Sequence, residues 1–150
     1  MKFLLPVCLL FLCSCRNQED EQLQRIDQAV DIYIKNAAGK DLLNPALPGS
    51  YRTVQLLDIG GTRDQISVAT DLKKDQKANY FISYVSGATR IRTDSVDSDF
   101  RKYRSDIILR LSPIAADSID LDTINIYYEW TPSLFTVTRM DYNRKQIFTK

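Results

Sequence analysis

The sequence predicts an all-β domain, an antiparallel two-sheet sandwich of the immunoglobulin-like kind, with a small lipocalin-like β-barrel as the alternative. From Ala29 onward, apolar residues recur at every second position in short runs rich in β-branched and aromatic side chains. This period is typical of strands with one buried face. Gly, Pro and Asn separate the runs and favour turns. Strands do not alternate with helical segments, which disfavours a parallel α/β sheet.

The alternating runs predict roughly seven to nine strands. In chain order they cover residues 30–35, 53–56, 65–69, 80–85, 107–112, 124–131, 134–142 and 146–149. Segments 124–131 and 134–142 flank a proline-containing turn and predict a hairpin. In the second segment the apolar side shifts between Val137 and Met140, which indicates a β-bulge. The best helix candidate is the short segment 21–29.

The first fourteen residues predict a signal peptide. Lys2 supplies a positive charge, and Phe3–Leu12 is an almost unbroken apolar run, much shorter than the roughly 20 residues of a membrane-spanning helix. The run ends in Leu12-Cys13-Ser14-Cys15, which resembles the lipobox of bacterial lipoproteins. The resemblance implies a diacylglycerol on the Cys15 sulfur, cleavage after Ser14, and acylation of the new amino terminus with a fatty acid such as palmitate.

Among the three cysteines, Cys15 fits the lipobox best. Cys13 would place the bulky Leu12 where a small residue is wanted, and Cys8 leaves too little apolar chain before it. An ordinary signal peptide with chance cysteines is the alternative. We therefore expect a signal peptide at 1–14, a lipidated N-terminus and polar tether at 15–27, and one β-sandwich domain at 28–150.

The tether carries the acidic run Glu19, Asp20 and Glu21. This run resembles the export signal of Bacteroidetes surface lipoproteins, which implies an outer-membrane lipoprotein exposed on the cell surface. A simple flexible spacer on a periplasm-facing lipoprotein is the alternative. In both cases the membrane is a partner, through the lipid anchor.

Two further segments resemble small uncharacterised surface lipoproteins of Bacteroidetes. They are Gly39–Pro45, which contains Asp-Leu-Leu-Asn-Pro, and Arg139–Lys145, which resembles the closing hairpin of those proteins. The resemblance implies the same location and a sandwich-like fold, and it carries over no catalytic residue. Those proteins more often have glycine where this chain has Arg144, a difference that disfavours a type I′ turn. We expect Asp41 and Asn44 to bond nearby backbone N–H groups.

Composition excludes several kinds of function. The formal net charge is +1 and includes Lys2 of the signal peptide, so the mature chain lacks the basic surplus of a nucleic-acid binder. The chain has no histidine, and Cys15 is its only cysteine after processing. Ser-His-Asp and Cys-His catalysis are therefore excluded, as are zinc sites built on imidazole or thiolate. We expect a protein that is not an enzyme and has no cofactor.

Three acids of one loop, Asp94, Asp97 and Asp99, are dense enough in oxygen ligands to suggest Ca²⁺. Arg101 stands where an EF-hand needs a ligand, so a solvated loop is the favoured interpretation and a bound cation is the alternative.

A carboxylate and an aromatic ring share one face of segment 124–131. Glu129 and Tyr127 could bind a sugar there, or Glu129 could be one member of a glycosidase pair. The favoured interpretation is an exposed polar face, because no pattern identifies a second carboxylate. Trp130, the single tryptophan, continues the opposite, apolar face after Tyr128 and is expected in the core.

These features predict a lipoprotein that acts as a non-enzymatic binding or structural module, with a glycan or an envelope protein as partner. The second hypothesis is a carrier or sensor of a small apolar ligand, suggested by the Tyr and Phe residues on the strands. A carboxylate-based glycosidase is the third.

Replacement of the acceptor cysteine tests the anchor. We expect Cys15→Ala to leave the membrane fraction, because stable anchoring takes two or more acyl chains and the variant acquires none. Cell fractionation and immunoblotting measure this, with Cys13→Ala as the control that stays membrane-bound. Protease added to intact cells should degrade the wild-type protein, and full protection would contradict surface exposure.

Overall fold

The computed structural model describes residues 23–63, 65–85, 87–95, 98–114 and 118–150, and in these ranges the chain forms strands and loops without a helix. The strands are β1 (Arg25–Asp27), β2 (Val30–Ile32), β3 (Tyr51–Asp58), β4 (Ile66–Val68), β5 (Asp71–Lys74), β6 (Tyr80–Tyr84), β7 (Ile91–Ser95), β8 (Arg101–Pro113), β9 (Asp120–Trp130), β10 (Leu134–Tyr142) and β11 (Lys145–Thr149). They form two sheets, so the predicted all-β class is confirmed.

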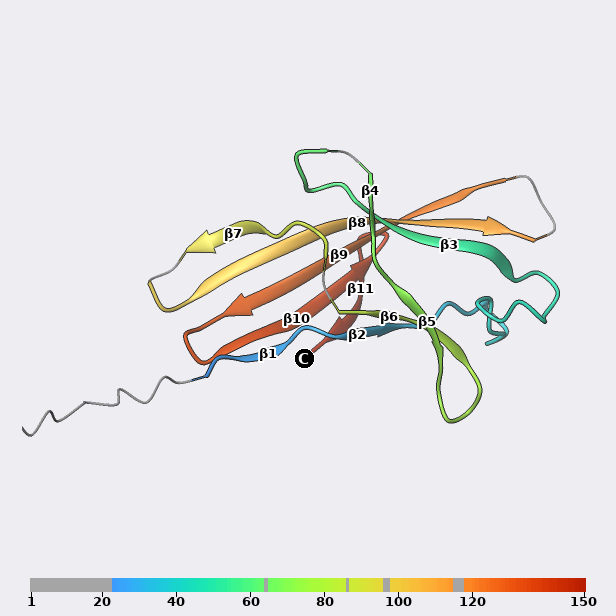
Figure 1. Cartoon of the computed structure of the whole chain (residues 1–150), viewed down its shortest axis with the longest axis horizontal. Coiled ribbons are helices and arrows are strands. Elements are labelled where there is room, and N and C mark those ends of the chain that lie inside the picture. The colour runs from blue at the N-terminus through green and yellow to red at the C-terminus, as the bar shows by residue number, and fades with distance from the viewer. Residues whose placement is uncertain (1–22, 64, 86, 96–97, 115–117) are drawn as a thin grey trace, which may run out of the picture.

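The larger sheet curls into a half-barrel (Figure 1). Its strand order is β1-β10-β9-β8-β3-β4, and off this path β11 pairs with β10 and β7 pairs with β8. The central strands β8, β9 and β10 are 13, 11 and 9 residues long. Because of this length, β10 pairs with β1 at its start and with β11 at its end. The β1–β10 ladder is parallel, and the other ladders between the described strands are antiparallel.

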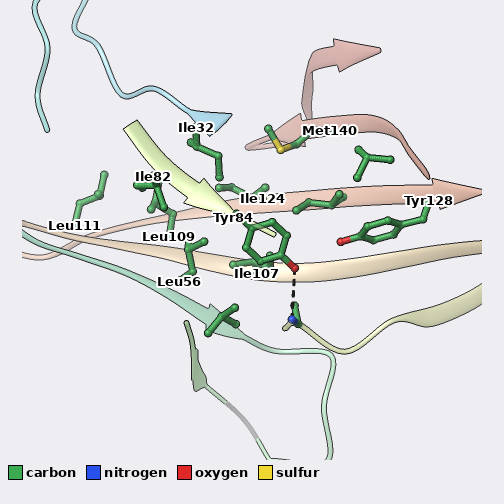
Figure 2. Packing of buried hydrophobic residues seen from close by; sticks show 14 of the residues in the cluster. Ile32, Leu56, Ile82, Tyr84, Ile107, Leu109, Leu111, Ile124, Tyr128 and Met140 are labelled. Carbon is green, nitrogen blue, oxygen red and sulfur yellow. Dashed lines mark hydrogen bonds between the residues drawn. The ribbon is translucent and has the colours of Figure 1, made fainter. Parts of the chain in front are cut away.

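The smaller sheet, β2-β6-β5, packs on the inner face of the half-barrel. Tyr84 of β6 is fully buried between the sheets, and its hydroxyl accepts a hydrogen bond of 3.4 Å from the N–H of Ala88 (Figure 2). Burial raises the pKa of the Tyr84 hydroxyl well above its usual range, so this group stays neutral. Both sheets contribute to one core: Ile32, Leu43, Leu56, Val68, Ile82, Tyr84, Ala88, Ile107, Leu109, Leu111, Ile124, Ile126, Tyr128, Phe135, Val137 and Met140.

The predicted C-terminal hairpin is confirmed. Strands β9 and β10 pair antiparallel, with Trp130 opposite Phe135. The register shifts between Val137 and Arg139, which is the bulge that the displaced apolar pattern indicates. The turn that leads to β11 departs from the expectation: Asn143 and Arg144 both have positive φ, 48° and 67°. Arginine therefore occupies the position of the turn where glycine is usual.

Four strands differ from the strand pattern in the sequence. Residues 23–29, the described part of the helix candidate 21–29, contribute β1 and the approach to β2, and β1 lies inside the stretch 15–27 expected as tether. Strands β5 and β7 were not predicted, because an edge strand such as β5, with four exposed residues, has no buried face to impose alternation. Strand β8 begins at Arg101, well before the predicted segment 107–112.

The Asp-Leu-Leu-Asn-Pro segment has the predicted structural role. The Asp41 carboxylate accepts hydrogen bonds from the N–H groups of Leu43 (2.9 Å) and Tyr80 (2.8 Å), and Asn44 accepts one from Ala46 (3.0 Å). Leu43 lies in the core with 2% of its surface exposed. The segment therefore places Leu43 in the core and is fastened through Asp41 to the start of β6.

Asp58, at the end of β3, joins two loops. Its carboxylate is 5% exposed and accepts hydrogen bonds from the N–H (2.8 Å) and hydroxyl (2.6 Å) of Thr89 and from the N–H of Gly60 (2.9 Å). Burial alone would raise the pKa of Asp58, but these hydrogen bonds outweigh it and hold the pKa below its usual range.

We expect Asp58→Asn to lower the free energy of unfolding by about 1–3 kcal/mol at neutral pH, because a neutral amide accepts these bonds less well. A lowered folded-state pKa gives stability that is present above the unfolded pKa of about 3.9 and is lost as pH falls through the folded value. The difference between variant and wild type should therefore narrow at about pH 3. Urea unfolding at both pH values measures it, with the exposed Asp31→Asn as control; an equal difference at both pH values would contradict the argument.

Candidate ligand-binding hollow

Strand β1 joins β10 at one edge of the half-barrel (Figure 1). Residues of β1, β8, β9 and β10 line an open hollow there. Its volume is about 410 Å³, within the range of small-molecule sites. We call it the aromatic hollow, and its lining residues are Gln24, Ile26, Gln28, Arg90, Tyr103, Trp130 and Phe135. The lining combines apolar rings with amide and guanidinium groups, the mixture that is typical of ligand pockets.

The register of the three long strands builds the floor of this hollow. Arg101 of β8 lies opposite Trp130 of β9, and Trp130 lies opposite Phe135 of β10. Tyr103 follows on the same face of β8, and its ring meets Phe135 edge-on, with centroids 6.2 Å apart. Phe135 in turn stacks on the buried ring of Tyr128 at 5.5 Å. The floor therefore rests on the core, which fixes the orientation of its rings.

Two guanidinium groups lie over these rings. Arg90 lies 4.8 Å from the centroid of Phe135 and 5.6 Å from that of Tyr128, and it donates a hydrogen bond to the side chain of Gln28. Arg101 lies 4.4 Å from the centroid of Trp130. At these distances each cation is attracted to the electron-rich ring face.

The start of β1 forms one wall, and backbone contacts hold it in place. The Gln24 side-chain amide donates to the carbonyl of Thr131 at 2.7 Å, and the N–H of Arg25 donates to the carbonyl of Ser133 at 2.9 Å. These bonds fasten β1 to the turn between β9 and β10. Ile26 is 62% exposed beside the hollow, so the wall presents an apolar side chain to a ligand.

A second opening, the edge groove, lies between β2 and β11. Two adjoining pockets of about 350 and 290 Å³ share Ile32, Tyr33 and Ile147. An ion pair between Asp27 and Lys150 lies at one end, and the Lys150 ammonium holds the pKa of Asp27 below its usual range. The other apolar lining residues of the two pockets are Ala29, Val30, Ile34, Leu109, Ile124, Val137, Met140, Tyr142 and Phe148.

Two arginines on the outer face of the half-barrel form ion pairs with carboxylates of the same sheet. Arg104 and Arg139 lie on either side of Tyr127 in register, and they pair with Asp106 at 2.8 Å and Asp141 at 2.5 Å. The hydrogen bonds from Arg139 hold the pKa of Asp141 below its usual range. These four charges are therefore paired within the sheet and are poor candidates for a ligand site.

Two of the predicted residues of segment 124–131 lie on opposite faces, as alternation requires. Glu129 lies on the outer strand face, in register with Lys102 and Thr136. Trp130 departs from the expectation of a core position: it packs against the core but is only partly buried and lines the aromatic hollow. The reason is its place at the last position of β9, where the smaller sheet no longer covers the half-barrel.

The acids of the candidate cation loop are spread over different elements. Asp94 lies in β7, in register with Lys102, and Asp99 accepts a hydrogen bond from Ser98 at 3.0 Å. Asp97 lies outside the described residues, as does Cys15. Within the described ranges, no group of three or more Asp, Glu, His or Cys side chains is placed to hold a metal ion.

Sequence reasoning did not identify Gln24, Gln28, Arg90, Tyr103 or Phe135 as site residues. The alternation of Tyr103 with its neighbours places it on the inner face of β8. That signal predicts a side-chain direction, but not that the hollow beside it is open.

Removal of the Arg101 guanidinium tests the stacked arrangement. We expect Arg101→Ala to increase acrylamide quenching of the single Trp130 and to lower stability by about 1 kcal/mol, because one face of the indole loses its cover. Arg110→Ala, on the outer face of the same strand, is the matched control. Quenching that is the same in the two variants would contradict the stacked geometry.

No helix within the described residues is long and apolar enough to cross a membrane. Comparison of the chain with models of protein families, with curated proteins and with solved structures gives no match. The function must therefore be argued from the chemistry of the aromatic hollow and of the edge groove.

Proposed function

We propose that the protein is a surface-exposed outer-membrane lipoprotein, anchored through Cys15, whose one β-domain is a non-enzymatic binding module for glycans. The observation that supports this proposal is the aromatic hollow, where the partly buried rings of Trp130 and Tyr103 lie beside amide and guanidinium groups. For the domain we propose an immunoglobulin-like relationship for the two packed sheets, with a lipocalin-like barrel as the alternative.

The chemistry of the lining fits a sugar. A pyranose ring has an apolar face of C–H groups and a rim of hydroxyls. Flat aromatic rings such as Trp130 and Tyr103 offer the apolar face a matching surface. The side-chain amide of Gln28 and the guanidinium of Arg90 lie in the same hollow and can donate hydrogen bonds to the hydroxyls.

The floor is held in place before any ligand binds. Phe135 is 7% exposed and contacts both Tyr103 and Tyr128, so its ring cannot turn away without opening the core. A site whose side chains are already ordered loses less conformational entropy on binding. This rigidity favours a recognition function for the hollow.

The tether would keep the site close to the membrane. The stretch from Cys15 to Gln24 can span at most about 30 Å when fully extended. Gln24 itself lines the hollow. A lipid on Cys15 would therefore hold the hollow within reach of glycans at the cell surface.

The edge groove supports a second candidate, a carrier of a small apolar ligand. Its lining is mainly aliphatic and aromatic, and Ile147 and Phe148 of β11 are 51% and 38% exposed at its opening. Apolar side chains that line an opening next to the core are typical of sites for apolar molecules.

A calorimetric titration with neutral and acidic oligosaccharides tests the glycan site. We expect Trp130→Ala to weaken binding by roughly thirtyfold, about 2 kcal/mol, because a central aromatic anchor is removed. Tyr33→Ala removes an aromatic ring from the edge groove instead and should leave the affinity unchanged. Absence of glycan binding, together with binding of a fatty-acid probe that Tyr33→Ala weakens, would replace the first candidate by the second.

A further inference from the structure

We infer that the aromatic hollow selects glycans that carry a carboxylate, and that Arg90 and Arg101 are the groups that recognise this charge. The inference rests on the proposed glycan function and names its substrate class. It depends on the surroundings of Arg90 and Arg101, which differ from those of the ion-paired Arg104 and Arg139.

Two arginines on the outer face, Arg104 and Arg139, are neutralised by carboxylates of the protein. Arg104 and Arg139 form ion pairs with Asp106 and Asp141, on the same strands two residues away. The positive charge of each of these two guanidinium groups is therefore compensated by a carboxylate of the same strand.

Arg90, which lines the hollow, and Arg101, which lies beside it over the ring of Trp130, have a different environment. Ion pairs between the described residues include neither Arg90 nor Arg101. Arg90 donates to the neutral side chain of Gln28, and Arg101 makes one long hydrogen bond of 3.4 Å to the carbonyl of Ser98. The Nε of Arg101 is buried and has no hydrogen-bond partner within the described structure. None of the described lining residues of the hollow is acidic, so the charge of Arg90 is not neutralised by its neighbours in the lining.

The chemistry of the two groups suits a carboxylate. The guanidinium carbons of Arg90 and Arg101 lie 4.8 Å and 4.4 Å from the ring centroids of Phe135 and Trp130, and attraction to the ring holds each group in place. A guanidinium presents its N–H donors along its planar edge. Planar carboxylates accept two parallel hydrogen bonds from such an edge, a geometry that a neutral hydroxyl does not match.

The two kinds of contact lie close enough for one acidic sugar. Arg101 and Trp130 are cross-strand partners, and Trp130 and Arg90 line the same hollow. A sugar ring placed on the aromatic floor therefore has a guanidinium within reach of a carboxylate at its rim. Uronic acids combine these features, since the carboxylate is attached directly to the pyranose ring.

The test compares one acidic trisaccharide with its neutral counterpart on the full chain in detergent. Titration calorimetry would use trigalacturonic acid, galactotriose and inorganic phosphate as probes. We expect the acidic trisaccharide to bind at least about tenfold more tightly than the neutral one, from charge-assisted hydrogen bonds. Raising the ionic strength should weaken only the acidic ligand.

Four variants connect the preference to the two arginines. Arg90→Gln and Arg101→Gln should each weaken the binding of trigalacturonic acid severalfold more than that of galactotriose, and Arg90→Lys should restore only part of the acidic preference. Arg110→Gln, on the outer face of β8, should keep the full preference. Thermal unfolding of each variant checks that the fold is intact.

The outcomes separate the inference from the proposed function. Equal binding of the two trisaccharides would overturn the carboxylate inference and leave the glycan site standing, and so would a preference that survives both Gln variants. Binding of phosphate as tight as that of trigalacturonic acid would also overturn the inference, because the site would then recognise negative charge and not an acidic sugar. If neither trisaccharide binds, both proposals fail.

Discussion

The fold depends on covering the inner face of the three long strands β8, β9 and β10. Their inward side chains, among them Leu109, Ile126 and Val137, would be in contact with water if the larger sheet stood alone. Strand β6 covers them with Ile82 and Tyr84, which are 3% and 0% exposed. Since burial of each large apolar side chain contributes about 1.5–3 kcal/mol, the contact between the sheets is the main source of stability on which the other features rest.

Incomplete coverage explains where the openings lie. The smaller sheet has three short strands, whereas the half-barrel follows strands of up to 13 residues. At one end of the inner face, Leu43 adds to the core and Asp41 fastens its segment to the start of β6. The other end extends past the smaller sheet, and there the inward row of Tyr103, Trp130 and Phe135 forms the floor of a hollow. The floor of this site follows from the unequal size of two packed layers, and Gln24, Gln28 and Arg90, which lie outside the strands, complete its lining.

Sequence patterns predicted those parts of the fold in which one buried face dictates alternation. The β9–β10 hairpin and its bulge near Val137 were predicted on these grounds and are confirmed. The hydrogen bonds of Asp41 were predicted from the tendency of Asp to bond nearby backbone N–H groups, and they are confirmed as well. Strand β5 escaped prediction because all four of its residues are exposed, and β1 because it is short and pairs in parallel with a strand far along the chain. Edge strands adopt their conformation because they pair with a neighbouring strand. The hydrophobic periodicity of the sequence carries no information about that pairing.

For Trp130, too, the sequence predicts the face of the strand but not how far the side chain is buried. Alternation with Tyr128 assigns it correctly to the inner face of β9, and a large apolar residue on that face is expected to be buried. Whether the face is covered at that point depends on how far the other sheet extends, which is a tertiary property. The same argument applies to Arg101, which faces inward because it lies in register with Trp130. If a second sheet covered this position, burial of the guanidinium charge would cost free energy. An arginine and a tryptophan paired at the end of an inward-facing row are therefore, in this fold, a sequence-level sign that the row ends in an open site.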